Sequence, residues 1–157
     1  MSAVEQRGYT ANLIKEARRL NEAMVEHVAG MVEGDRVVIL GLSFKPDIKT
    51  FENTHTLKLV DALKAAHDVV VHDPFLDYEV FEFEVEKDFY KAVEGADCIV
   101  LSTAHSTYKK MDWKELKKRM RGDLIVDVRG FFDAGEVEAN GLRYKGIGRI
   151  LRGLDKD

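Results

Sequence analysis

The segment RVVILGLSFKPD, residues 36–47, decides the fold. Its first part, Arg36–Leu40, is a run of β-branched and aliphatic residues short enough to be a buried strand. Gly41 ends that strand and lets the backbone approach a ligand. The loop that follows carries an aromatic ring and a lysine, Phe44 and Lys45. A buried strand with such a loop at its carboxyl end is typical of α/β proteins that bind nucleotides.

The pattern of strand followed by helix repeats along the chain. Buried strands are predicted at Val69–Val71, Cys98–Leu101 and Leu124–Val126, with a half-exposed edge strand at Phe81–Val85 and a weaker strand after Gly141. Helices are predicted over Ala11–Val32, after a cap at Thr54, over Asp88–Glu94 and from Asp112 to Met120. The alternation predicts an α/β fold, namely a Rossmann-like three-layer sandwich with a mainly parallel sheet, preceded by a long N-terminal helix.

Composition excludes several classes of protein. A length of 157 residues suits one ordinary domain, and a net charge of −4 argues against a nucleic-acid binder. The chain has neither an apolar run long enough to span a membrane nor the pattern of a signal peptide, so no membrane partner is expected. A single cysteine, Cys98, excludes an internal disulfide, fits a reducing cytoplasm and predicts no metal site.

The loops at the carboxyl ends of the strands hold the candidate binding residues. Phe44 and Lys45 could meet a ring and a phosphate, although neither a GxGxxG fingerprint nor a P-loop spacing occurs in the chain. Asp73 and His105 lie on two other loops, where a structural role is the favoured interpretation of each. Because Cys98 lies inside an apolar strand, it is interpreted as a buried residue and not as a nucleophile.

Several segments together resemble the C-terminal UDP-binding domain of the UDP-glucose/GDP-mannose dehydrogenase family. They occur in the family's order and are GLSFKPD from Gly41, HDP from His72, GAD from Gly95, DVR from Asp127 and YKGIGR from Tyr144, with ARRLNE from Ala17 upstream. The likeness is greatest to the branch that acts on UDP-N-acetylmannosamine.

The resemblance implies a role for individual residues. It implies that Phe44, Lys45 and Arg129 contact the UDP-sugar, that residues 1–33 correspond to a helix of the family's central domain, and that residues 34–157 form the UDP-sugar-binding domain. NAD is the cofactor of the parent enzymes, and none is expected for this chain alone. Glu52 stands where many relatives carry an arginine associated with NAD, so the cofactor-binding residues are unknown, and no catalytic residue is expected.

These observations favour one function and leave two alternatives open. The favoured function is the UDP-sugar-binding domain of an NAD-dependent nucleotide-sugar 6-dehydrogenase, which oxidises the C6 hydroxyl of UDP-N-acetylmannosamine or UDP-glucose to a carboxylate; the chain by itself is expected to be catalytically incomplete. One alternative is a free-standing, non-enzymatic module that binds a uridine nucleotide, and the other is an unrelated nucleotide- or coenzyme A-binding domain. Expected partners are a UDP-sugar and either a second copy, through the N-terminal helix, or separately encoded dehydrogenase domains.

Overall fold

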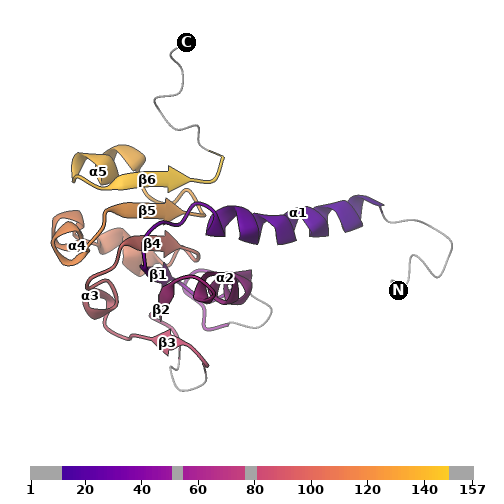
Figure 1. Ribbon diagram of the computed structural model, residues 1–157, viewed down its shortest axis with the longest axis horizontal. Coiled ribbons are helices and arrows are strands. Elements are labelled where there is room, and N and C mark those ends of the chain that lie inside the picture. Colours follow the sequence, from indigo (N-terminus) through magenta and orange to yellow (C-terminus); the bar gives the residue numbers. More distant parts are fainter. Residues whose placement is uncertain (1–11, 51–54, 77–80, 149–157) are drawn as a thin grey trace, which may run out of the picture.

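A six-stranded parallel sheet forms the centre of the molecule (Figure 1). A computed structural model describes residues 12–50, 55–76 and 81–148. The strand order is β3-β2-β1-β4-β5-β6, and every neighbouring pair is parallel. The strands are β1 (Arg36–Leu40), β2 (Asp68–His72), β3 (Glu84–Val85), β4 (Cys98–Leu101), β5 (Leu124–Asp127) and β6 (Arg143–Gly146). The predicted α/β class and parallel sheet are therefore confirmed.

Helices cover both faces of the sheet. They are α1 (Asn12–Ala29), α2 (His55–Lys64), α3 (Phe89–Ala92), the 3-10 helix η2 (Ser106–Lys110), α4 (Trp113–Arg119) and α5 (Ala134–Ala139).

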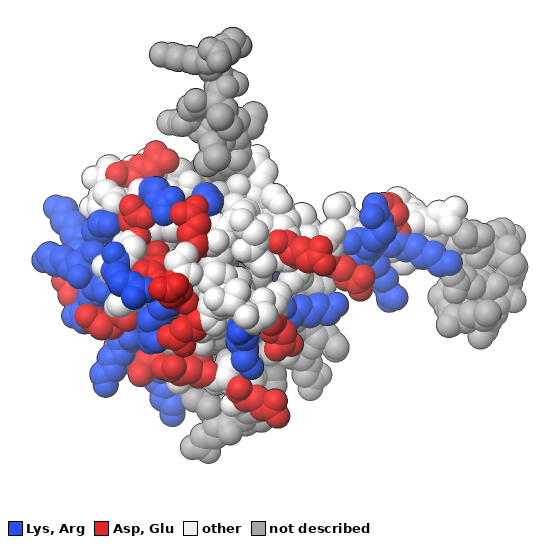
Figure 2. Space-filling model, in the orientation of Figure 1, with Lys and Arg blue, Asp and Glu red and all other residues white. Residues whose placement is uncertain are grey.

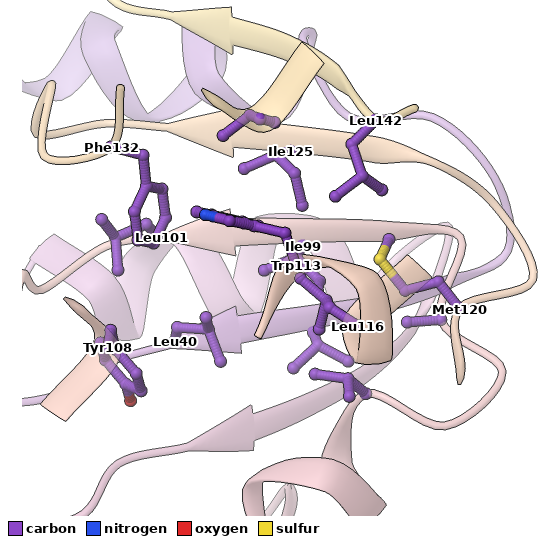
Figure 3. Packing of buried hydrophobic residues seen from close by; sticks show 14 of the residues in the cluster. Leu40, Ile99, Leu101, Tyr108, Trp113, Leu116, Met120, Ile125, Phe132 and Leu142 are labelled. Carbon is purple, nitrogen blue, oxygen red and sulfur yellow. The ribbon is translucent and has the colours of Figure 1, made fainter. Parts of the chain in front are cut away.

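The strand residues alternate between two cores. Val38 and Leu40 join the core under α3, α4 and α5, whereas Val37 and Ile39 join the core under α2 and the end of α1. Trp113 lies in the first of these cores, among the side chains of β4 and β5 (Figure 3).

Three short helices begin at aspartates whose carboxylates cap the first turn. Asp88, Asp112 and Asp133 each accept hydrogen bonds from backbone amides of the following turn. Such caps satisfy donors that have no partner inside the helix. They fix where α3, α4 and α5 start, although each of these helices is only four to seven residues long.

The N-terminal helix α1 extends away from the sheet (Figure 1). Every residue from Asn12 to Ala23 is exposed, and Val28 near the end of the helix is its only buried residue. Leu13 and Leu20 are 84% and 62% exposed. No helix in the described part of the chain is long and apolar enough to cross a membrane.

Some boundaries differ from those that the sequence predicts. The strand predicted over Phe81–Val85 is paired only at Glu84 and Val85, next to β2, and it does lie at the edge of the sheet. Phe81 and Phe83 stack on each other instead, with ring centroids 5.1 Å apart. α5 and η2 were not predicted, because AGEVEA contains a glycine and has few apolar residues, and η2 is a single tight turn.

Candidate functional site

The carboxyl edge of the sheet gathers the loops that follow β1, β2, β4 and β5. In parallel α/β sheets this edge is where ligands bind. The loop after β1, whose described residues 41–50 are here named the β1 loop, is held near its start and at Asp47. It carries the predicted contacts Phe44 and Lys45.

The first residues of the β1 loop are fixed by a buried carboxylate. Asp73, at the end of β2, accepts hydrogen bonds from the amides of Leu42 and Ser43, both at 2.8 Å. Thr103 donates its hydroxyl to the carbonyl of Ser43 at 2.6 Å. Gly41 has φ +86°, and a Cβ there would lie 2.5 Å from Cβ of Thr103, so only glycine allows this close approach.

Phe44 and Lys45 are presented to solvent by this fixed backbone. The Phe44 amide donates to the carbonyl of Thr50 at 2.6 Å, which closes the loop on itself. The Phe44 side chain is 51% exposed, and Lys45 is also exposed. Both side chains can therefore reach a ligand without any movement of the backbone.

Arg129 follows β5, and its guanidinium has one fixed edge. The Arg129 amide donates to Asp127 Oδ1 at 2.8 Å, and Nε donates to the carbonyl of Ser102 at 2.6 Å. This bond restricts the orientation of the guanidinium plane. A guanidinium oriented by one edge is suited to binding a phosphate or carboxylate with the other.

Arg129 lines a groove of about 230 Å³ between α1, α2 and the sheet edge. The lining is mostly apolar, and its polar groups come from Asn21, His55, Ser102 and Arg129. The lining residues are Asn21, Met24, Val25, Val28, His55, Leu59, Ser102, Val128, Arg129 and Ile147. Phe44 and Lys45 do not line this groove, although they lie on the same carboxyl edge of the sheet.

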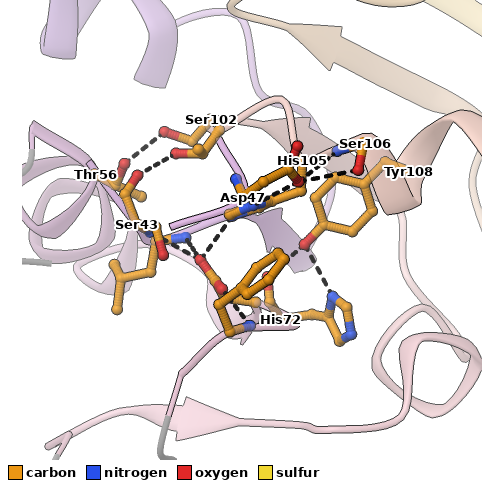
Figure 4. A network of polar contacts seen from close by, with 12 residues as sticks. Ser43, Asp47, Thr56, His72, Ser102, His105, Ser106 and Tyr108 are labelled. Atoms are coloured by element: carbon orange, nitrogen blue, oxygen red, sulfur yellow. Dashed lines mark hydrogen bonds and ion pairs between the residues drawn. The ribbon is translucent and has the colours of Figure 1, made fainter. Parts of the chain in front are cut away.

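A network of buried polar groups lies beneath the β1 loop (Figure 4). His105 Nε2 lies 3.0 Å from Asp73 Oδ2, and both side chains are fully buried. Burial alone would raise the pKa of Asp73, but the hydrogen bonds from His105 and from the amides of Ser43 and Phe75 outweigh it and lower the pKa to about 2. Asp73 is thus an ionised structural anchor, as its position in the Asp-Pro turn predicted.

Cys98 has the buried surroundings that the sequence suggested. The Cys98 side chain is buried in β4, and burial raises the pKa of its thiol to about 12. Such a thiol is not a nucleophile near neutral pH.

His55 is the first residue of α2 and lines the groove. Glu52 lies outside the described residues.

The basic residues of α4 form a mixed surface. Lys118 and Arg119 pair with Glu115, and Arg119 also pairs with Glu94. On the side of the molecule that carries α3, α4 and α5, blue and red side chains interleave (Figure 2). The charged face of α4 is therefore a solvated surface with both signs of charge.

The described residues can be compared with the requirements of a metal ion, and Gly41 with those of a dinucleotide fingerprint. Within those residues, no three His, Cys, Asp or Glu side chains group so that they could hold a metal ion. In a dinucleotide fingerprint, glycines open the backbone to a pyrophosphate. Here the space that a Cβ would need at Gly41 is filled by Thr103, so this glycine serves internal packing and does not fit a role in binding NAD.

The sequence did not indicate the hydrogen-bond partners of three polar residues at the carboxyl edge of the sheet. Thr56 and Ser102 share a hydrogen bond of 2.7 Å between their hydroxyls, and His105, expected on a loop, is fully buried. The signal that could have indicated Ser102 and His105 is their position in the loop that follows a buried strand, β4. Their pairing depends on residues about 30 to 60 positions away, which periodicity does not report.

Comparison with known proteins gives one consistent family. Residues 38–134 match the sequence profile of the "UDP-glucose/GDP-mannose dehydrogenase family, UDP binding domain". The UDP-N-acetyl-D-mannosamine dehydrogenase of Pyrococcus horikoshii is 31% identical over 149 residues, which cover 87% of this chain and 34% of that protein. The UDP-glucose 6-dehydrogenase of Rhizobium meliloti is 29% identical over 141 residues, covering 84% of this chain and 31% of that protein.

Solved structures give the same result. The structure of the UDP-D-ManNAc dehydrogenase from P. horikoshii superposes with a TM-score of 0.78 at 28% identity, covering 93% of this chain and 36% of that one. An NDP-N-acetyl-D-galactosaminuronic acid dehydrogenase from Methanosarcina mazei gives a TM-score of 0.76 at 30% identity, covering 85% and 31%. The chain thus spans about a third of the length of the relatives that it matches.

Proposed function

Because this chain belongs to the UDP-glucose/GDP-mannose dehydrogenase family, over the part that forms its UDP-binding domain, we propose that it binds the UDP portion of a nucleotide sugar at the carboxyl edge of its sheet. The observation that carries the proposal is the guanidinium of Arg129, held by Ser102 at the rim of a mostly apolar groove. Phe44 and Lys45 on the β1 loop complete the proposed site.

The charges of these residues suit a diphosphate. The chain has a net charge of −4, so an anionic ligand must be held by local cations. Arg129 offers a planar fork of donors, and Lys45 offers a mobile point charge on an exposed stem. The exposed ring of Phe44 offers a face on which the uracil or the sugar can pack.

We assign the chain a binding role within a nucleotide-sugar 6-dehydrogenase. The reaction of such an enzyme oxidises the C6 hydroxyl of UDP-N-acetylmannosamine or UDP-glucose to a carboxylate, and NAD supplies the oxidising power when it is bound. The described residues contribute substrate binding only, because the Cys98 thiol is buried and protonated. A non-enzymatic module that binds a uridine nucleotide is the second candidate, supported by the same observation.

Calorimetric titration tests the proposal. The chain is titrated with UDP, UDP-N-acetylmannosamine, UDP-glucose and NAD, and the titrations are repeated on Lys45→Ala and Arg129→Ala. We expect saturable binding of UDP that either substitution weakens about 10- to 100-fold, the size of a lost charge-assisted hydrogen bond. Lys118→Ala removes an exposed positive charge from α4 and is the matched control. Heat signals that are the same for all four proteins would contradict the proposal.

Titration and an activity measurement with added domains separate the two candidate functions, the enzyme domain and the non-enzymatic module. An enzyme domain is expected to distinguish UDP-sugars from UDP or to gain activity when the rest of a dehydrogenase is supplied as separate domains. A module that binds only the nucleotide is expected to bind UDP and UDP-sugars equally and to leave NAD reduction by added domains unchanged.

We also propose that α1 pairs with a second copy of the chain. Its first half exposes an apolar stripe made by Leu13, Ala17 and Leu20. The charges along α1 are unevenly distributed, with Lys15, Arg18, Arg19 and one glutamate, Glu16, in the first half and Glu22 and Glu26 in the second. An antiparallel pair of helices would bury the stripe and place the more basic half of one copy against the acidic half of the other, in a contact that uses the same surface of both copies.

A further inference from the structure

The β1 loop is also held at Asp47, by the imidazole of His105 and by Ser106. The amide of Asp47 donates to His105 Nδ1 at 2.9 Å, and the Asp47 carboxylate accepts from both the amide and the hydroxyl of Ser106. Asp47 has φ +58°, in the left-handed region that residues other than glycine seldom adopt. These contacts maintain the sharp turn immediately after Lys45 and Pro46.

The same imidazole connects the end of the loop to its beginning. His105 Nε2 contacts Asp73 Oδ2 at 3.0 Å, and that oxygen also accepts the amides of Leu42 and Ser43 at 2.8 Å. Asp73 and His105 thus join the two ends of the segment that carries Phe44 and Lys45. Neither exposed side chain takes part in this bridge.

The hydrogen bonds fix the tautomer of His105. A backbone N–H can only donate, so Nδ1, which faces the Asp47 amide, must be the acceptor. Nε2 then carries the proton and donates it to the Asp73 carboxylate. The Asp47 carboxylate is 3.8 Å from Nδ1, beyond hydrogen-bond distance. One neutral form of the ring therefore satisfies both bonds.

Aromatic neighbours hold the plane of the ring. The Phe75 ring lies over His105 with a centroid distance of 5.1 Å and an angle of 33°, and Tyr108 packs against it edge-on at 5.7 Å. His105 has no exposed surface. It cannot touch a ligand directly, but it can determine where the backbone of the β1 loop lies.

We propose that His105 is a positioning residue of the binding site, which holds the β1 loop so that Phe44 and Lys45 face the nucleotide. This inference rests on the proposed function, because it gives His105 a task in ligand binding. The bond from Nδ1 to Asp47 is the one that matters for this task, since Asp73 holds Leu42 and Ser43 without help from His105.

Two amide substitutions separate the two bonds of the ring. In His105→Asn, the side-chain carbonyl occupies the place of Nδ1 and still accepts from Asp47. In His105→Gln, the longer side chain places a donor near Nε2 and still reaches Asp73, but it leaves the Asp47 amide without its acceptor. His72→Gln is the control, because His72 is also buried at this edge and bonds to Tyr108 instead of the β1 loop.

Two measurements are made on the wild-type chain and the three variants. Calorimetry gives the affinity for UDP, and amide hydrogen exchange gives the protection of Asp47 without any ligand. We expect His105→Gln to bind UDP about tenfold more weakly, the size of one lost hydrogen bond, and to exchange the Asp47 amide faster. His105→Asn and the control are expected to bind within about threefold of the wild type, below the effect of one lost hydrogen bond. Nitrogen chemical shifts of the His105 ring should show Nδ1 unprotonated.

Each other outcome overturns a specific statement. Equal weakening by the Gln and Asn variants would indicate general destabilisation and overturn the positioning role. The positioning role would also be overturned if the Asp47 amide of the Gln variant exchanged rapidly while the variant bound UDP as the wild type does. In that case the proposed function stands. A wild-type chain that does not bind UDP would overturn the proposed function and this inference with it, and the exchange data would then describe a purely structural histidine.

Discussion

The hydroxyl of Tyr144 donates to Asp127 Oδ2 across 2.9 Å, and both residues are buried. The same carboxylate accepts the amides of Arg129 and Phe132, each at 2.8 Å. One aspartate at the end of β5 therefore ties the last strand, β6, to the turn that presents Arg129. Loss of any of its donors is expected to affect the stability of this edge.

The Tyr144→Phe substitution tests that relationship. It removes one donor to a buried carboxylate and keeps the ring, so we expect the free energy of unfolding to fall by about 1 kcal/mol. Urea unfolding measures the change. Tyr90→Phe is the matched control, because the hydroxyl of Tyr90 makes no hydrogen bond among the described residues and its ring still packs under Arg119. An equal loss in the two variants would contradict the importance of the bond.

Acid is expected to weaken the fold through Asp73. Its pKa is about 2 in the folded chain, against about 3.9 for an unperturbed aspartate. Because the folded pKa is depressed, the ionised carboxylate stabilises the fold above about pH 4, and this contribution of about 2 kcal/mol is lost as the pH falls from 4 towards 2. Stability measured between pH 2 and 6 should therefore fall less steeply with acid in Asp73→Asn than in the wild type. Asp61→Asn, an exposed site on α2, should leave the slope of the wild type unchanged.

The thiol of Cys98 is expected to resist alkylation in the folded chain. Burial raises its pKa to about 12, so almost no thiolate exists at pH 8, and the side chain is inaccessible. Iodoacetamide at pH 8 should label the native chain much more slowly than the chain in concentrated urea, as measured by mass spectrometry. Rapid stoichiometric labelling of the native chain would mean that β4 opens readily.

Self-association through α1 is expected to depend on its apolar stripe. Replacing Leu13 and Leu20 with Glu places charges on the exposed face and should convert a dimer to a monomer at tens of micromolar, as measured by light scattering. Ala23→Glu adds one such charge outside the stripe and serves as the control. A wild-type chain that is already monomeric under these conditions would rule out the proposed pairing.

Local sequence was sufficient to predict most of the fold. The runs Val37–Leu40, Val69–Val71, Cys98–Leu101 and Leu124–Val126 are all within strands, because a short apolar run bounded by turn residues has few other stable conformations. α2 and α4 were predicted from helical periodicity and caps. The extent of β3 and the presence of α5 were not predicted, since both depend on pairing or packing against distant residues.

The candidate site, like the fold, was predicted only in part from the sequence. The sequence by itself determined the strand-and-loop order that brings Phe44, Lys45 and Arg129 to one edge of the sheet, because parallel strands all end at the same side. Only the tertiary structure decided that His105 is buried and joins Asp73 to Asp47. Those partners are 32 and 58 positions away, and a hydrogen bond between loops depends on how strands align in space, which no local pattern of residues encodes.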